Sequence, residues 1–253
     1  MQVLWVALAG FGVALVFSMV GSGGSQILVP ILFWFGFEFL DGAIPLALWL
    51  GAVICFSAGA LYYKRGLIML KMAIPFGSSV LVGSIIGALS SVPMQSNIMM
   101  IFFAASNIFM GFIILFSKGM KKRALSRKAE IWLSIILGIG VGFMLGFAGR
   151  DGGPFVVAIL ILLGFEAKEA AATTTLVLAS GCLAAFLVHL THADLTEIFW
   201  WPFLAGALAC IIGAQIGARF MTVKLDSRMV RFILAGVMFV MGVVLMVQGI
   251  MSL

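Results

Sequence analysis

The sequence predicts an all-α integral membrane protein built from two inverted-topology repeats. Three observations support this fold class: 64% of the residues are apolar and only 9% are charged, residues 72–117 carry no charge, and a Gly-rich segment occurs twice. Soluble domains have about 25% charged residues, because a folded surface must face water. This composition excludes a soluble globular domain, so we expect the outer surface to face lipid.

Charges and turn residues divide the chain into apolar runs, and most of them are long enough to cross a bilayer. A spanning helix needs about 20 predominantly apolar residues. The long runs lie near 3–20, 43–62, 72–90, 97–117, 131–148, 170–190, 198–218 and 228–250. Two further runs, 26–36 and 154–164, are too short to span. We therefore expect about 8 to 10 helical segments, two of them half-helices.

Basic residues orient these segments. Of the 15 Lys and Arg residues, 13 fall in three loops: Lys64, Arg65 and Lys71; then Lys118, Lys121, Lys122, Arg123, Arg127 and Lys128; then Arg219, Lys224, Arg228 and Arg231. The positive-inside rule makes these loops cytoplasmic, and such short loops do not indicate nucleic-acid binding. Only two full spans separate the second loop from the third, so residues 131–164 must return to their starting side. The sequence predicts a broken or re-entrant hairpin there, and both termini outside the cytoplasm.

The second half of the chain repeats the first. A shift of 128 residues places Gly21, Gly24 and Gly36 over Gly149, Gly152 and Gly164; shifts of 127 and 130 pair Cys55 with Cys182, and Gly83 and Gly87 with Gly213 and Gly217. Each half contains one hairpin and three crossings, an odd number, so the second copy enters the membrane from the opposite face. We divide the chain into a first repeat (1–117), a basic cytoplasmic linker (118–130) and a second repeat (131–253).

The Gly-rich tips of the two hairpins are the predicted binding site. Each tip opens a short helix, and a helix N-terminus attracts anions through its unpaired N–H groups and its dipole. Broken helices at corresponding positions of two repeats are typical of transporter sites. The predicted substrate-binding residues are Ser22, Gly23, Gly24 and Ser25 in the first tip, and Arg150, Asp151, Gly152 and Gly153 in the second. The alternative is that the glycines only allow sharp turns and close helix packing.

Other polar residues in apolar runs are candidates for the same site. Thr173, Thr174 and Ser57 could line it, although hydroxyl groups in membrane helices commonly make interhelical hydrogen bonds instead. Arg150 could hold an oxyanion, with Asp151 supporting it or exchanging protons, or the two could simply anchor the tip. If transport is coupled to protons, the candidate carriers are Asp151, Glu38, Glu166 and His189.

The order of these motifs resembles the TauE/SafE family of sulfite and organosulfur-anion transporters over nearly the whole chain. The resemblance rests on Gly21-x-Gly23-Gly24 with Pro30 and Gly36, on the copy from Gly149 to Gly164, and on Thr173-Thr174 and Ser57-x-Gly59. It implies a multi-pass transporter of the bacterial inner membrane that carries sulfite, a sulfonate such as sulfoacetate, or thiosulfate. The pair Arg150-Asp151 departs from the family pattern, which has small residues there.

Secondary export of such an anion is the predicted function. No ATP-binding motif is present, and an inside-negative membrane potential favours anion export by about 2.3 kcal/mol per charge per 100 mV. An anion channel of the same architecture is one alternative. An intramembrane serine hydrolase using Ser22 or Ser180 with His189 is another, although it lacks the Gly-x-Ser-x-Gly elbow. We expect no enzyme activity, no cofactor and no metal; the expected partners are the small anion and the bilayer.

Overall fold

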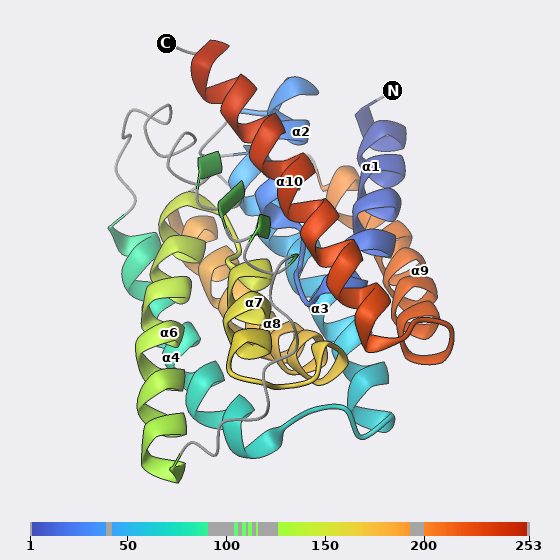
Figure 1. Cartoon of the computed structure of the whole chain (residues 1–253). Helices are drawn as coiled ribbons and strands as arrows, with labels where there is room; N and C mark the ends of the chain where they lie inside the picture. The colour runs from blue at the N-terminus through green and yellow to red at the C-terminus, as the bar shows by residue number, and fades with distance from the viewer. Residues whose placement is uncertain are drawn as a thin grey trace.

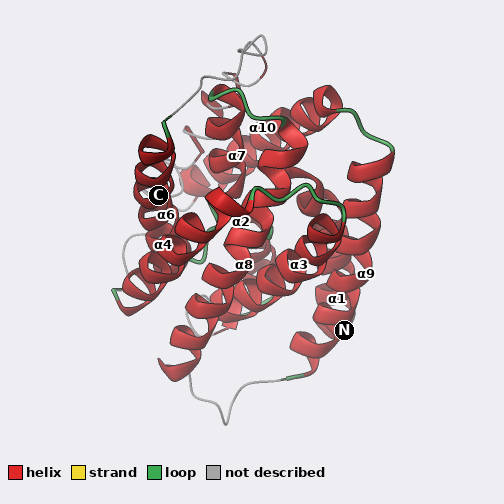
Figure 2. Cartoon of the chain, turned by 90° about the horizontal axis from the view of Figure 1, so that it is seen from below, coloured by secondary structure: helices red, strands yellow, loops and turns green. Residues whose placement is uncertain are grey.

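The computed structural model describes residues 2–38, 42–90, 126–192 and 200–251, together with 104–105, 108–109, 111–112 and 115. Within these residues the regular elements are all helices (Figures 1 and 2), which confirms the all-α prediction. They are α1 (Gln2–Phe17), the short 3-10 helix η1 (Ser18–Val20), α2 (Ser25–Trp34), α3 (Ile44–Lys64), α4 (Leu70–Leu89), α6 (Arg127–Ala148), α7 (Gly153–Leu162), α8 (Ala167–His192), α9 (Trp201–Val223) and α10 (Ser227–Met251).

The starts of several helices follow from local sequence. Pro45, Pro154 and Pro202 lie in the first turns of α3, α7 and α9, where the missing N–H of proline has no intrahelical partner to lose. Ser126 precedes α6, and its hydroxyl oxygen accepts a hydrogen bond from Ala129 N at 3.3 Å. This serine acts as an N-cap and fixes where α6 begins.

Six described stretches are long and apolar enough to cross a membrane: Gln2–Val20, Ile44–Lys64, Leu70–Leu89, Ile131–Ala148, Ala167–Thr191 and Trp201–Val223. By contrast α2 and α7 have 10 residues each. At about 1.5 Å per residue they reach about 15 Å, half of a bilayer core of about 30 Å. The two short runs are therefore half-helices. Most of the predicted span 97–117 lies outside the described residues.

The first hairpin returns to the side from which it enters. Gln2, at the start of α1, donates a hydrogen bond from Nε2 to Phe35 O at 3.3 Å, and Phe35 directly follows α2. The start of α1 and the end of α10 lie at the same end of the molecule (Figure 1). The ends of α3 and α9 and the start of α6, which carry basic residues, lie at the other end. That the basic end is cytoplasmic stays a prediction.

Helices related by the sequence shift make corresponding contacts. Helix α1 packs against α9, and α6 packs against α4, on opposite sides of the central pair α3 and α8 (Figure 2). A Cβ added to Gly213 would lie 2.5 Å from Phe11 O, and one added to Gly83 would lie 2.5 Å from Ile139 O. Glycine therefore lets the helix backbones touch in both interfaces. The exact boundaries 1–117, 118–130 and 131–253 stay a prediction, since residues 116–125 lie outside the described part.

Candidate anion site between two Gly-rich tips

Each hairpin turns at a position that only glycine can occupy. Gly21 ends η1 with φ +80°, and Gly149 ends α6 with φ +64°, a left-handed conformation that costs other residues energy. A Cβ on Gly21 would also lie 2.7 Å from Val157 Cγ2. On Gly149 it would lie 3.3 Å from Val29 Cγ2. Val29 and Val157 are themselves 128 positions apart. The two turns therefore pack in the same way, each against a valine of the other repeat's half-helix.

The two tips touch backbone to backbone. A Cβ added to Gly153, the first residue of α7, would lie 2.6 Å from Gly21 O and 2.9 Å from Ser22 Cα. On the other side of the first tip, a Cβ on Gly23 would lie 2.9 Å from Gly51 O on α3. The starts of α2 and α7 are thus brought together inside the bundle, between half-helices that enter from opposite ends (Figure 1).

Asp151 of the second tip binds to the first tip. Ser22 Oγ donates to Asp151 Oδ1 at 2.5 Å, while Ser25 donates to Oδ2 from its backbone N at 3.1 Å and from its Oγ at 3.2 Å. Asp151 N donates back to Ser25 Oγ at 3.1 Å. The carboxylate, only 1% exposed, therefore occupies the N-terminus of α2. A negative group is favoured there because the helix dipole points its positive end at it.

This contact supplies the start of α2 with a hydrogen-bond acceptor. Gly24 is the N-cap, with φ +72°, and Ser25 is the first helical residue. The acceptor for the start of α2 is the carboxylate of a residue 126 positions away. The repeat contained a usable signal for this neighbour, since the shift of 128 places Asp151 on Gly23 in the first tip.

Arg150 contributes a buried positive charge to the second tip. Its side chain is only 3% exposed and follows the turn at Gly149. The shift of 128 aligns it with Ser22, the residue that donates to Asp151. Charges are rarely buried at membrane depth without a functional reason, and here one of each sign lies in consecutive residues.

The remaining predicted residues make polar contacts with other helices. Thr173 Oγ1 accepts from Met69 N at 3.1 Å, at the start of α4. Ser57 Oγ accepts from Gln215 Nε2 at 3.0 Å, and the same nitrogen donates to Ser57 O at 2.7 Å. Thr174 is fully buried, and its Oγ1 has no hydrogen-bond partner within the described residues. Of the predicted set, the structure joins the two tips and places Thr173 and Ser57 in separate contacts.

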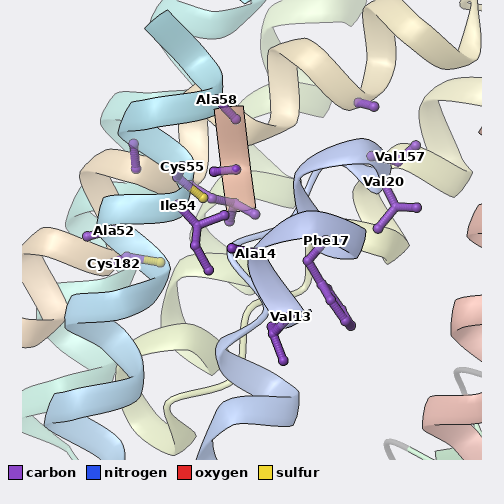
Figure 3. Close-up of a cluster of buried hydrophobic side chains, with 14 of the residues drawn as sticks. Val13, Ala14, Phe17, Val20, Ala52, Ile54, Cys55, Ala58, Val157 and Cys182 are labelled. Carbon is purple, nitrogen blue, oxygen red and sulfur yellow. The ribbon is translucent and has the colours of Figure 1, made fainter. Parts of the chain in front are cut away.

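A pair of thiols lies behind the first tip. Cys55 on α3 and Cys182 on α8 are fully buried, and a Cβ on Gly51 of α3 would lie 3.5 Å from Cys182 Sγ. A Cβ on Gly23 would lie 3.1 Å from Cys55 Sγ, so the first tip packs directly on this pair. Figure 3 shows both cysteines in the buried cluster that also contains Val13 and Phe17 of α1. Cys55 and Cys182 occupy equivalent positions in the two repeats, so the two halves of the chain meet at this point.

The matched family decides the class of protein. Residues 6–245 match the family model described as Sulfite exporter TauE/SafE. The chain belongs to the TauE/SafE family. It is similar to the probable membrane transporter protein YdhB of Bacillus subtilis (strain 168), with 23% identity over 85% of this chain and 89% of the relative. It is also similar to the probable membrane transporter protein y4hK of Sinorhizobium fredii (strain NBRC 101917 / NGR234), with 25% identity over 97% and 98%. No solved structure matches the chain.

As a member of the TauE/SafE family, this chain is a multi-pass membrane transporter and not an enzyme. The residues of the alternative hydrolase make the following contacts in the structure. Ser22 donates to Asp151, Ser180 donates to Val177 O at 2.9 Å, and His189 Nε2 lies 2.8 Å from Gly146 O. A serine nucleophile needs a base within hydrogen-bonding distance, and in these contacts neither serine is paired with His189.

Proposed function

We propose that this TauE/SafE protein is a secondary transporter that exports a small sulfur-containing oxyanion from bacterial cells. The substrate class is sulfite, a sulfonate such as sulfoacetate, or thiosulfate, and the binding site is the junction of the two tips near mid-membrane. The single observation that carries this proposal is the set of donors at the start of α2, the hydroxyls of Ser22 and Ser25 and the backbone N of Ser25, which already surround a two-oxygen anion.

The physical basis is electrostatic. The N-terminus of α2 carries about half a positive charge, and its attraction for an anion is strong where water is scarce. Arg150 adds a full positive charge in the same buried region. Irregular backbone at membrane depth is tolerated when it is buried in protein or lines a cavity, and the two tips meet this condition through their mutual contact.

The proposed mechanism is alternating access, in which one repeat moves against the other around the contact of α3 with α8. Export needs no coupling ion, because the membrane potential supplies about 2.3 kcal/mol per charge per 100 mV. We place both termini outside the cytoplasm and the protein in the inner membrane. The direct contact of Gly153 with Gly21 favours a gated carrier over an open anion channel, since it closes the junction between the tips.

Binding to the purified protein tests the proposal. We expect sulfite, sulfoacetate or thiosulfate to bind the wild-type protein. Because Asp151 accepts from the same donors, the serines are tested in the Asp151→Ala background. There Ser22→Ala and Ser25→Ala should each weaken binding about 10-fold or more, because a hydrogen bond to a charged group contributes about 1.5–3 kcal/mol. Ser78→Ala is the matched control, since Ser78 lies on α4 and donates only to Pro75 O within its own helix.

Two outcomes would contradict the proposal. In the first, none of these anions binds the folded wild-type protein. In the second, Ser22→Ala and Ser25→Ala in the Asp151→Ala background bind as well as Ser78→Ala in the same background. A liposome experiment separates carrier from channel: a carrier exchanges labelled substrate across the membrane against unlabelled substrate, and an anion channel shows no such counterflow.

A further inference from the structure

We propose that the carboxylate of Asp151 is a resident competitor of the transported anion, which must leave the start of α2 before substrate binds there. This inference rests on the proposed function and assigns Asp151 a gating role within that site. In the observed structure, Asp151 uses the same donors that an oxyanion would use, namely Ser22 Oγ and the N and Oγ of Ser25.

The geometry of Asp151 matches that of a small oxyanion. Its two oxygens take different donors, with Oδ1 accepting from Ser22 Oγ and Oδ2 accepting from Ser25. Sulfite and sulfonate groups present three oxygens, two of which can occupy these positions. A further donor lies in the same turn, since Gln26 is 3% exposed and its Nε2 has no hydrogen-bond partner among the described residues. The carboxylate is itself 1% exposed, so substrate and carboxylate cannot share these donors.

The repeat argues against a purely structural role for this carboxylate. Position 23, the mate of Asp151, is glycine, and its backbone packs against Gly51 and Cys55. The N-cap of α7 is Gly152, and Gly153 N donates to Asp151 Oδ1 within the same tip at 3.4 Å. The turn of the first tip thus forms without an acidic residue of its own. The carboxylate of Asp151 in the second tip is therefore not needed to form such a turn and can have another function.

The contact also joins the two repeats. Asp151 belongs to the second tip, and both serines that bind it belong to the first, 126 to 129 positions away. When an anion displaces the carboxylate, these cross-repeat hydrogen bonds are lost. Substrate binding is thereby linked to the relative movement of the halves, which is the step that alternating access requires.

Removing the resident anion gives the decisive test. We expect Asp151→Ala to bind sulfite about 10-fold more tightly than wild type, because the apparent affinity of wild type is reduced by the fraction of molecules in which the carboxylate has left. Formate should raise the melting temperature of Asp151→Ala and compete with sulfite, and should do neither in wild type. Asp226→Asn, a change at an exposed carboxylate just before α10 and away from the tips, should leave both measurements as in wild type.

Asp151→Asn keeps the gating role testable if the alanine variant fails to fold. It retains the shape and loses the charge, so its sulfite affinity should also rise, by less than that of Asp151→Ala. Equal or weaker sulfite binding by folded Asp151→Ala and Asp151→Asn would overturn the gating role and leave Asp151 as a structural cap. If neither wild type nor any variant binds an anion, the proposed function itself fails, so the two failures are distinguishable.

Discussion

The two tips form the same kind of turn before a half-helix, but with different residues. The first tip, Ser22-Gly23-Gly24-Ser25, is small and uncharged, whereas the second, Arg150-Asp151-Gly152-Gly153, carries one charge of each sign. Both begin at a glycine with positive φ, and both are seated on a valine of the opposite half-helix. The turn at the start of a tip therefore does not require a charged residue within that tip, so the two charges of the second tip have a role other than forming its turn.

The difference makes the two half-helices unequal. The start of α2 has a carboxylate from the opposite repeat, but the start of α7 has no such group from the first tip, because position 23 is glycine. Gly153 N instead donates to Asp151 Oδ1, within its own tip, at 3.4 Å. In a protein with two nearly symmetric halves, one residue at the junction thus makes the two ends of the site chemically distinct.

The largest effect is expected from separating the tips. In Gly153→Ala the new methyl group would lie 2.6 Å from Gly21 O and 2.9 Å from Ser22 Cα. Both are backbone atoms and cannot move aside as a side chain could, so the tips must shift apart. We expect flux of sulfite into or out of liposomes to fall to background.

The control for that change lies in the same tip. Gly152 has φ −89°, and a Cβ there would lie 3.1 Å from Val141 Cγ1, an atom at the end of a side chain. Gly152→Ala should therefore keep most of the flux. If Gly153→Ala transports as well as Gly152→Ala, the tip contact is not part of the transport path.

A second, smaller effect concerns the paired interfaces outside the site. Gly83→Ala and Gly213→Ala each place a methyl group 2.5 Å from a backbone oxygen of the facing helix. Overpacking of this kind costs about 1–3 kcal/mol, so both variants should have lower melting temperatures in detergent. The two decreases should be similar, because the sequence shift relates the two contacts. Markedly unequal decreases would show that the interfaces are not equivalent.

Glycines on the same helix pairs provide matched controls. Gly12 on α1 and Gly140 on α6 are 128 positions apart, and a Cβ on either meets no atom of the described residues within 4 Å. Gly12→Ala and Gly140→Ala should leave the melting temperature unchanged or raise it, since alanine favours a helix by about 1 kcal/mol over glycine. A decrease in either control would mean that membrane-facing glycines also have a packing role.

Much of the fold is predictable from sequence because a membrane-spanning helix needs a long apolar segment, which is visible in the composition of the chain. Apolar runs of the right length predict the spans, runs that are too short predict the half-helices α2 and α7, and the Gly-rich tips predict where these two short helices begin. These signals are local. Each depends on a residue and its neighbours in the chain, or on the length of an apolar segment.

The partners inside the site were less accessible because they are distant in sequence. Ser25 is predicted to bind substrate, but nothing in its neighbourhood along the chain indicates that its acceptor is a carboxylate from the other repeat. Ser57 was expected to line the site, and Gln215, 158 positions away, binds it. Sequence gives the depth of a polar residue in the membrane, but it does not say which residue at that depth is its neighbour.

Ser57 supplies the smallest predicted effect. Its hydroxyl and carbonyl oxygens both accept from Gln215 Nε2, and it borders an apolar pocket of about 550 Å³ lined by residues such as Trp49 and Leu183. Hydrogen bonds of this kind between membrane helices contribute about 0.6 kcal/mol. Ser57→Ala should therefore lower stability slightly and preserve sulfite binding. A double-mutant cycle with Gln215→Ala should give a coupling energy of about 0.6 kcal/mol. Loss of sulfite binding in folded Ser57→Ala would instead place the substrate between α3 and α9, away from the tips.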